Sequence, residues 1–207
     1  MPVVHGECQA RLEPVRAQLS AALAAGDEAG ASLCAIADGQ TLLDLWGGIA
    51  DVDTGTPWQR DTIVNVFSVT KTMTALGALV LVDAGQLDLD APVAKYWPEF
   101  AAAGKADVLV RHLLGHTSGL AGWQQRVSLA DIYDTQAAAD LLAAQEPWWE
   151  PGTASGYHAM NQGHRVGELV RRLTGQSLGT FFRTELAEPM DADFFIGTPA
   201  NVDERIA

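Results

Sequence analysis

The sequence is poor in basic residues and in long apolar runs. Its 207 residues include 13 lysines and arginines against 26 aspartates and glutamates, which gives a formal net charge of -13. This acidic excess argues against nucleic acids and anionic membranes as partners, because both are bound through basic patches. The longest apolar segment is interrupted by Gly77, Asp83 and Gly85, so we expect no helix that spans a bilayer.

Cysteine is also scarce, and the two present have neither metal-binding nor redox spacing. Cys34 lies in the strand-like segment ASLCAIA, and we expect it to be a small buried hydrophobic residue. The first residues, MPVVHGECQARLEPV, lack the basic and apolar regions of an export signal. These features favour a cytoplasmic protein.

A hydrophobic content of 48% is enough for a substantial core.

Periodicity and turn residues predict a helix, then strands, then a mostly helical region. Two strands separated by Asp38-Gly39 form an expected antiparallel hairpin. A small open hairpin is only marginally stable alone, and the rest of the chain offers at most one further short strand. We therefore expect the sheet to be unfinished. The predicted elements are a helix at 7–25, strands at 30–39 and 40–51, an extended segment at 61–67, a buried helix at 68–87, helices and loops over 91–150, helices at 160–174 and near 177–186, and a short strand at DFFIG.

Ser68 and Lys71 form the first chemical motif, in the segment FSVTKTM at a predicted helix start. Positions i and i+3 share a helical face, so the hydroxyl and the amine can meet. A neutral lysine could accept the proton of a nucleophilic serine, and the helix end would stabilise the negative charge that forms. The alternative is structural, with Ser68 as a helix cap and Lys71 as a surface residue.

Tyr157 is the second candidate, and the chain has only three tyrosines. It follows PWWEPGTASG, an irregular loop rich in proline, glycine and serine, and it precedes a predicted helix. A tyrosine on such a loop could act as a base if a nearby lysine lowers its pKa. A core or capping role is the other interpretation.

Several other residues invite chemical interpretations. The segment GHTSG around Ser118 is similar to a nucleophile elbow, but its serine comes one place late. His112 and His116 have helical spacing that could suit a metal, yet the HExxH arrangement is missing, so we expect no metal. His158 and His164 could join a site or be satisfied structural groups.

The loops rich in tryptophan supply the expected substrate contacts. Two adjacent tryptophans can line an apolar acyl pocket or simply fix the conformation of the loop. The expected substrate-binding residues are Trp123, Gln124, Trp148, Trp149 and His158.

With these residues assembled, the chain resembles the serine β-lactamase-like hydrolases, and most closely their family VIII carboxylesterases. Four stretches carry the resemblance, in the family's order: FSVTKTMTALGALVLVDAGQLDLDAPVAKYWPEF, VLVRHLLGHTSGL, WEPGTASGYHAMNQGHRVGELVRRLTG and LAEPMDADFFIG. Together they span most of residues 60–198. Their combination is far more specific than Ser-x-x-Lys alone.

The resemblance implies an α/β fold of the α+β type, similar to β-lactamases and penicillin-binding transpeptidases. An antiparallel sheet flanked by helices would carry an inserted, mostly helical domain. The implied limits are 1–66 for the first part of the α/β domain, 67–160 for the helical domain with the serine, and 161–207 for the return to the sheet.

The resemblance also implies the roles of the site residues. Ser68 would be the acylated nucleophile, Lys71 its proton acceptor, and Tyr157 the residue that handles the leaving-group proton and activates water. No metal or organic cofactor is implied. The expected partner is a small ester, with a second polypeptide as an open possibility.

Two departures from the family pattern shape the expectation. Class C β-lactamases carry Tyr-x-Asn where this chain has Tyr157-His158-Ala159, which favours an esterase over a lactamase. The third family motif, a strand that supplies an oxyanion donor, is absent, so we expect the chain to lack the C-terminal strands. The sequence therefore predicts a serine carboxylesterase for short-chain acyl esters, or its N-terminal part. A β-lactamase, a D-amino-acid peptidase and a non-catalytic fragment are the alternatives.

Overall fold

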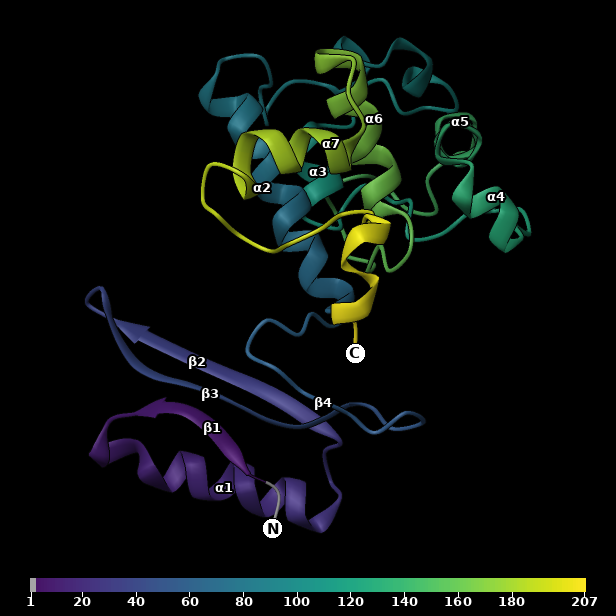
Figure 1. Ribbon diagram of the computed structural model, residues 1–207. Coiled ribbons are helices and arrows are strands. Elements are labelled where there is room, and N and C mark those ends of the chain that lie inside the picture. Colours follow the sequence, from purple (N-terminus) through teal and green to yellow (C-terminus); the bar gives the residue numbers. More distant parts are fainter. Residues whose placement is uncertain (1–2) are drawn as a thin grey trace. The chain divides into compact units, whose positions relative to one another are not determined.

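The computed structural model describes residues 3–207, which pack as two compact units (Figure 1). The sheet unit contains the residues up to 65 together with 198–207, and the helical unit contains 66–197. In sequence, the helical unit is thus inserted between two segments of the sheet unit. Residues 161–197 pack with the helical unit, and the three domain limits expected from the sequence stay a prediction.

The sheet unit is built on four antiparallel strands (Figure 1). Strand β3 lies between β2 on one side and β1 on the other, and β4 pairs with the end of β3. The turn between β2 and β3 has positive φ at Asp38 (49°) and Gly39 (73°), which suits the twist of a tight hairpin. The predicted hairpin is therefore confirmed. The strands are β1 (Val4–Cys8), β2 (Gly30–Ala37), β3 (Gln40–Asp51) and β4 (Thr56–Pro57).

Helix α1 (Glu13–Ala25) supplies the core of the sheet unit. Its Leu19 and Leu23 pack with Leu43 and Leu45 of β3. The helix ends at Gly26, which has the left-handed conformation that a C-terminal glycine adopts readily. The predicted end is confirmed, but the predicted start at residue 7 is wrong.

The error at the start has a physical cause. Residues 4–8 pair with β3, from Val4 opposite Gly47 to Cys8 opposite Leu43, and such long-range pairing overrides a local helical pattern. A short 3-10 turn (Ala10–Leu12) then leads into α1, whose first turn holds Pro14, a residue suited to that place.

Three other predictions in and around the sheet are wrong. Cys34 is exposed, because β2 pairs with β3 alone among the described strands and the middle of β2 is uncovered. Residues 61–67 form no strand: Ile63 makes a single bridge to Ile206. The segment DFFIG is also irregular rather than extended in a sheet.

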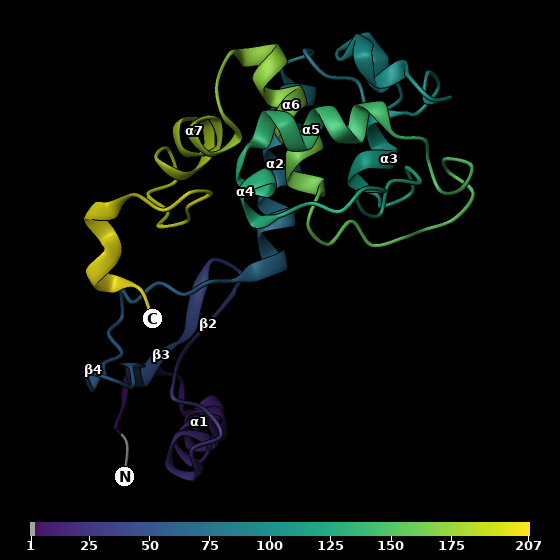
Figure 2. The same ribbon diagram turned by 90° about the vertical axis from the view of Figure 1, so that its right-hand side faces the viewer.

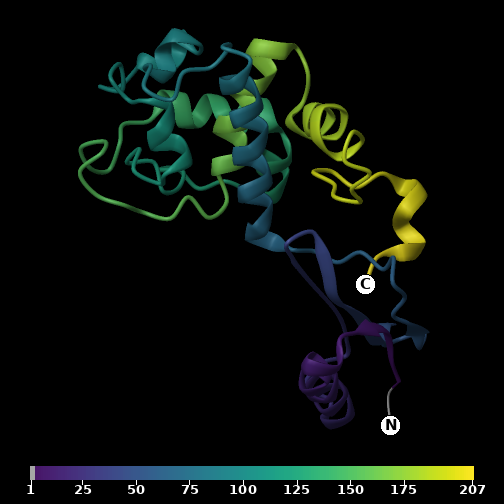
Figure 3. The same cartoon turned by 90° about the vertical axis from the view of Figure 1, so that its left-hand side faces the viewer.

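The helical unit is organised around α2 (Thr70–Asp83), which packs against α6 (Gln162–Thr174) and α7 (Leu178–Phe182) (Figures 1 and 3). Helix α5 (Thr135–Ala144) packs against α6 (Figure 2). The remaining elements are α3 (Val110–Leu114), α4 (Leu129–Tyr133), 3-10 turns at Phe67–Val69, Val93–Lys95 and Pro98–Ala101, and a π-helical turn at Arg183–Ala187, while a further 3-10 turn, Ala200–Arg205, lies in the sheet unit.

The sequence predicts α2, α6 and α7, which have clear local signals, whereas α3, α4 and α5 lie in the region 91–150 for which it predicts only helices and loops. Helix α6 ends where Gly175 adopts a left-handed φ of 74°, as expected from the glycine. Helix α2 buries one face only, since Leu76 and Leu79 are about two-fifths exposed, at 40% and 44%. The expectation of a buried helix therefore holds for one face of α2 and is wrong for the face that carries Leu76 and Leu79.

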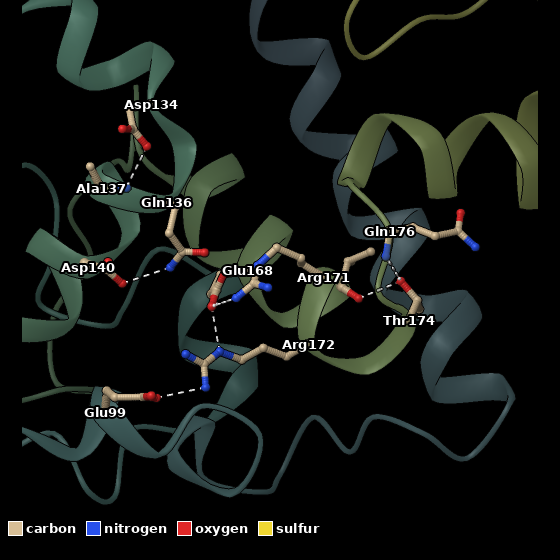
Figure 4. Close-up of polar contacts among 11 residues, drawn as sticks. Glu99, Asp134, Gln136, Ala137, Asp140, Glu168, Arg171, Arg172, Thr174 and Gln176 are labelled. Carbon is tan, nitrogen blue, oxygen red and sulfur yellow. Dashed lines mark hydrogen bonds and ion pairs between the residues drawn. The ribbon is translucent and has the colours of Figure 1, made fainter.

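The helical unit has its own apolar core, and a polar cluster ties α6 to it. Trp97 and Phe100 are fully buried and their ring centroids lie 5.1 Å apart. Glu168 of α6, almost buried, accepts hydrogen bonds from Arg171 and Arg172, and Arg172 also pairs with Glu99 (Figure 4).

Candidate active site

Ser68 lies in the 3-10 turn that leads into α2, and Lys71 is the second residue of that helix. The turn brings the two side chains to one face, so the Lys71 Nζ donates to the Ser68 Oγ over 3.1 Å. Phe67, just before the serine, has φ of 45° in the left-handed region. Such a conformation costs of order 1–3 kcal/mol in a bulky residue, and strain of this kind clusters at functional sites.

Tyr157 meets the same serine from a distant part of the chain. Its hydroxyl donates to the Ser68 Oγ over 2.6 Å, across a separation of 89 residues. The Lys71 Nζ lies 4.9 Å from the centroid of the tyrosine ring. The serine oxygen therefore has both an amine and a phenol within hydrogen-bonding distance, and all three residues belong to the helical unit.

The electrostatics of this group favour a tyrosine that ionises easily. Hydrogen bonding to Ser68, and then to Lys71, lowers the pKa of Tyr157, and the positive charge of Lys71 acts in the same direction. Burial acts in the opposite direction but does not outweigh these hydrogen bonds, and Tyr157 is 53% exposed. A phenol with a lowered pKa is a better proton acceptor near neutral pH than an ordinary tyrosine.

The loop that carries Tyr157 is held by close packing around a glycine. A Cβ on Gly156 would lie 2.2 Å from the Cη2 of Trp149, so the indole ring occupies the space that a side chain would need. The Trp149 Nε1 in turn donates to the Ala154 carbonyl over 2.9 Å. Trp149, expected to contact substrate, thus fixes the loop beside the tyrosine.

Behind the tyrosine lies a buried polar network that the sequence did not suggest. Arg165 of α6 is fully buried and donates to the Oδ1 of Asn161 (2.6 Å) and to the Oγ of Ser118 (2.7 Å). The Ser118 Oγ lies 3.2 Å from the His158 Nε2, and the His158 Nδ1 lies 3.3 Å from the Leu113 carbonyl. Since a carbonyl only accepts, His158 Nδ1 carries a proton, and Ser118 donates to the other ring nitrogen.

His158 is therefore a neutral structural group in this structure. Burial, then the charge of Arg165, lowers its pKa to about 3. The ring has no exposed surface. The sequence predicts His158 among the substrate-binding residues, but the structure places it in the interior, where Ser118 and Leu113 engage both ring nitrogens.

The other expected substrate residues lie in different surroundings. The Trp123 Nε1 donates to the Ala138 carbonyl over 2.9 Å, and its ring packs edge-on against His164. Gln124 donates its backbone N–H to Gln145 and lines a surface hollow of about 320 Å³. Trp148 is 50% exposed. The structure brings Ser68, Lys71 and Tyr157 together, and the contacts of Trp123, Gln124 and Trp148 with a substrate stay a prediction.

The described part of the chain has neither a cluster of metal ligands nor a membrane-spanning helix. Within residues 3–207, no group of three or more His, Cys, Asp or Glu side chains is arranged to hold a metal ion. In the same part of the chain, no helix is both long enough and apolar enough to cross a membrane.

Comparison with known proteins identifies the family. The Beta-lactamase family model matches residues 15–207, almost the whole chain. The chain therefore belongs to the β-lactamase family of serine hydrolases, and its antiparallel sheet with helices matches the fold of solved members.

Esterases and a penicillin-binding protein homologue are among its relatives. The esterase/beta-lactamase LipL of Mycobacterium tuberculosis is 41% identical over 180 residues, covering 86% of this chain and 42% of LipL. The esterase EstB of Burkholderia gladioli is 34% identical over 169 residues, covering 73% of this chain and 43% of EstB. A family VIII carboxylesterase crystal structure superimposes with a TM-score of 0.93 at 46% identity, covering 99% of this chain and 57% of the other. A penicillin-binding protein homologue from Caulobacter crescentus gives a TM-score of 0.93 at 38% identity, covering 99% and 55%. The chain thus spans about half the length of these relatives.

Proposed function

We propose that this chain carries the nucleophile and proton-transfer groups of a serine carboxylesterase that cleaves short-chain acyl esters. The observation that carries the proposal is the convergence of Lys71 and Tyr157 on one serine oxygen, at 3.1 and 2.6 Å. A serine hydroxyl is a weak nucleophile until an adjacent base takes its proton. Here two groups able to exchange a proton, the Lys71 amine and the Tyr157 phenol, lie within hydrogen-bonding distance of the Ser68 Oγ.

The reaction proceeds through an acyl-serine. The Ser68 Oγ attacks the ester carbonyl carbon while its proton passes to the deprotonated Tyr157, either directly or through a neutral Lys71 amine. The tetrahedral intermediate then expels the alcohol, which takes up that proton through Tyr157. In the second half, Tyr157 removes a proton from water, water attacks the acyl carbon, and Ser68 recovers its proton as the acid leaves.

Several features support an ester rather than a β-lactam as substrate. Ala159 stands where class C β-lactamases have the asparagine of Tyr-x-Asn, and a methyl group cannot bind a side-chain amide. Phe67 and Val69, the neighbours of Ser68 in the chain, are both exposed, at 79% and 53%, and offer apolar contacts to an acyl chain. The similarity to a family VIII carboxylesterase and to EstB points the same way.

Hydrolysis of p-nitrophenyl butyrate and of a chromogenic cephalosporin tests the proposal. We expect the ester to be turned over with the larger kcat/KM, and Ser68→Ala to abolish this turnover while the circular dichroism spectrum is unchanged. Ser20→Ala, on α1 of the sheet unit, is the matched control and should leave turnover intact. Turnover that survives in Ser68→Ala would overturn the assignment. A larger kcat/KM for the cephalosporin would replace the esterase with a β-lactamase.

The partners and the cellular location of the protein are proposals as well. We propose a small-molecule ester as the substrate. Because the chain spans about half of its relatives' length, we also propose a second polypeptide that completes the fold. The cytoplasmic location stays a prediction from the sequence.

A further inference from the structure

His116 contacts the segment around Tyr157 at three consecutive residues. Its backbone carbonyl accepts from the Gly156 N–H over 3.0 Å, and its Nδ1 accepts from the His158 N–H over 3.1 Å. Between these two bonds its ring packs edge-on against the Tyr157 ring, with centroids 4.9 Å apart. The residue before the tyrosine, the tyrosine itself and the residue after it are therefore all held by one histidine.

The backbone of His116 is itself unusual, with φ of 62°. Histidine, asparagine and aspartate enter this left-handed region more readily than most residues other than glycine. The conformation lets the carbonyl and the ring Nδ1 of one residue reach the same segment. A histidine in this position thus combines a permissive backbone with an acceptor on its side chain.

The hydrogen bonds define the proton state of His116. Nδ1 must be unprotonated to accept from the His158 N–H, so the ring is neutral with its proton on Nε2. The groups that face it are Lys71 of α2, Arg165 of α6, and the rings of Tyr157 and His158. Burial, then the charges of Lys71 and Arg165, lowers the pKa of His116, which keeps the acceptor free near neutral pH.

We propose that His116 is a positioning residue for the reaction, which holds the Tyr157 hydroxyl against Ser68 through its Nδ1 acceptor bond to the following residue. This inference rests on the proposed function, because it concerns the tyrosine assigned there as the proton-transfer group. A phenol that drifts by about 1 Å from its partner can lose on the order of 100-fold in rate. His116 acts through Tyr157 and needs no contact with substrate.

The test is a spectrophotometric titration of Tyr157, which does not depend on turnover. The chain has three tyrosines, and subtracting the titration of Tyr157→Phe isolates the one in the site. His116→Gly and His116→Asn both tolerate the left-handed backbone, but only asparagine keeps an acceptor near the place of Nδ1. His112→Asn is the control at a neighbouring histidine, whose Nδ1 accepts from Leu109 rather than from the tyrosine loop.

We expect His116→Gly to raise the pKa of Tyr157 towards the ordinary value of a tyrosine, because the hydrogen bonds to Ser68 and Lys71 are lost. We also expect it to slow acylation by roughly 10- to 100-fold. His116→Asn should keep both properties close to wild type, and so should His112→Asn. An unmoved Tyr157 pKa in a folded His116→Gly protein would overturn the inference. An equal rise in His116→Asn and His116→Gly would also overturn it, because the acceptor bond would then have no part.

A measurement on the unaltered protein keeps the inference testable if His116→Gly does not fold. Nitrogen-15 shifts of the five histidines report which ring nitrogen carries the proton. We expect His116 to be neutral near neutral pH with the proton on Nε2. A cationic ring, or a proton on Nδ1, would contradict the proposed bond. The two proposals can fail separately. If the wild-type protein does not hydrolyse esters but the Tyr157 pKa still rises in His116→Gly and not in His116→Asn, the proposed function is refuted and the positioning role of His116 stands.

Discussion

Replacing Glu168 with glutamine should destabilise the helical unit, because this carboxylate holds two arginines beside α6. The Glu168 side chain is 3% exposed and accepts from Arg171 (Nε and Nη2, both 2.8 Å) and from Arg172 (Nε, 2.6 Å). Arg172 also lies over the ring of Trp97, with 5.6 Å between its Cζ and the ring centroid. The polar contacts of this cluster are drawn in Figure 4, and the stacking of Arg172 on Trp97 connects α6 to the apolar core of the unit.

The expected loss follows from what glutamine can still do. Its single carbonyl oxygen can keep one arginine as a donor, while its amide group faces the other arginine as a second donor. A hydrogen bond to a charged group contributes about 1.5–3 kcal/mol, and a buried charge pair broken on one side costs about 3–5 kcal/mol. Arg171 and Arg172 are 49% and 22% exposed and can turn to water, so we use the lower figure. We expect a loss of about 2–3 kcal/mol in the free energy of unfolding, or about 4–12 °C in the midpoint for a protein of this size.

The stabilising effect of Glu168 should depend on pH with a definite sign. Burial raises the pKa of Glu168, but the hydrogen bonds and charges of Arg171 and Arg172 outweigh it and hold the pKa below its usual value. The folded state therefore binds this proton less readily than the unfolded state. The stabilisation is complete above the ordinary glutamate value of about 4.3 and is lost as the pH falls through the lower value of the folded protein.

Thermal and urea unfolding near neutral pH and at acid pH would measure this effect. Glu99→Gln is the matched control, because Glu99 pairs with the same Arg172 but its side chain is 66% exposed. An exposed ion pair contributes little, so the control should stay close to wild type. The difference between wild type and Glu168→Gln should narrow below about pH 4. Equal midpoints for the two variants, or a difference between wild type and Glu168→Gln that persists in acid, would contradict this role of Glu168.

Two further predictions concern the loop and the tyrosine of the site. Tyr157→Phe should slow acylation by about 100- to 10,000-fold in stopped-flow assays, because the general acid–base group is lost. In the wild type, kcat/KM should rise with pH with a midpoint below the ordinary tyrosine pKa, because the Tyr157 pKa is lowered. This rise should be absent in Tyr157→Phe. If it remains, a group other than Tyr157 causes it. Gly156→Ala should displace Trp149 and reduce both stability and turnover, whereas Gly163→Ala, with nothing within 4 Å of its new Cβ, should be neutral or slightly stabilising by unfolding and activity assays. Equal effects of the two alanines would argue against close packing at Gly156.

The local part of the site could be predicted from the sequence, and the distant part could not be derived from spacing alone. Ser68 and Lys71 are three residues apart at a helix start, so their contact follows from helical geometry. Tyr157 is 89 residues from Ser68, and only the family resemblance pointed to their meeting. The segment GHTSG was recognised, but its role as a support for the tyrosine loop depends on contacts that no local pattern encodes.

The same division runs through the fold. Helix ends at Gly26 and Gly175 were predicted, because a glycine beyond the last turn is a local signal. Strand β1 was missed because its partners lie about forty residues away in β3, and the exposure of Cys34 depends on what covers β2. His158 resembled a site residue in the sequence, but the buried Arg165 and Ser118 beside it define an interior environment. Burial and long-range pairing are collective properties of the folded chain.

The activation of Ser68 is tested most simply by reaction of the purified chain with a fluorophosphonate, followed by intact mass measurement and peptide mapping. An activated serine forms a phosphonyl ester with this reagent, whereas an ordinary serine does not react appreciably. We expect one adduct, on Ser68, that is lost in Ser68→Ala and retained in Ser20→Ala. An adduct on another residue, or a folded chain that does not react at all, would contradict the claim that Lys71 and Tyr157 activate Ser68.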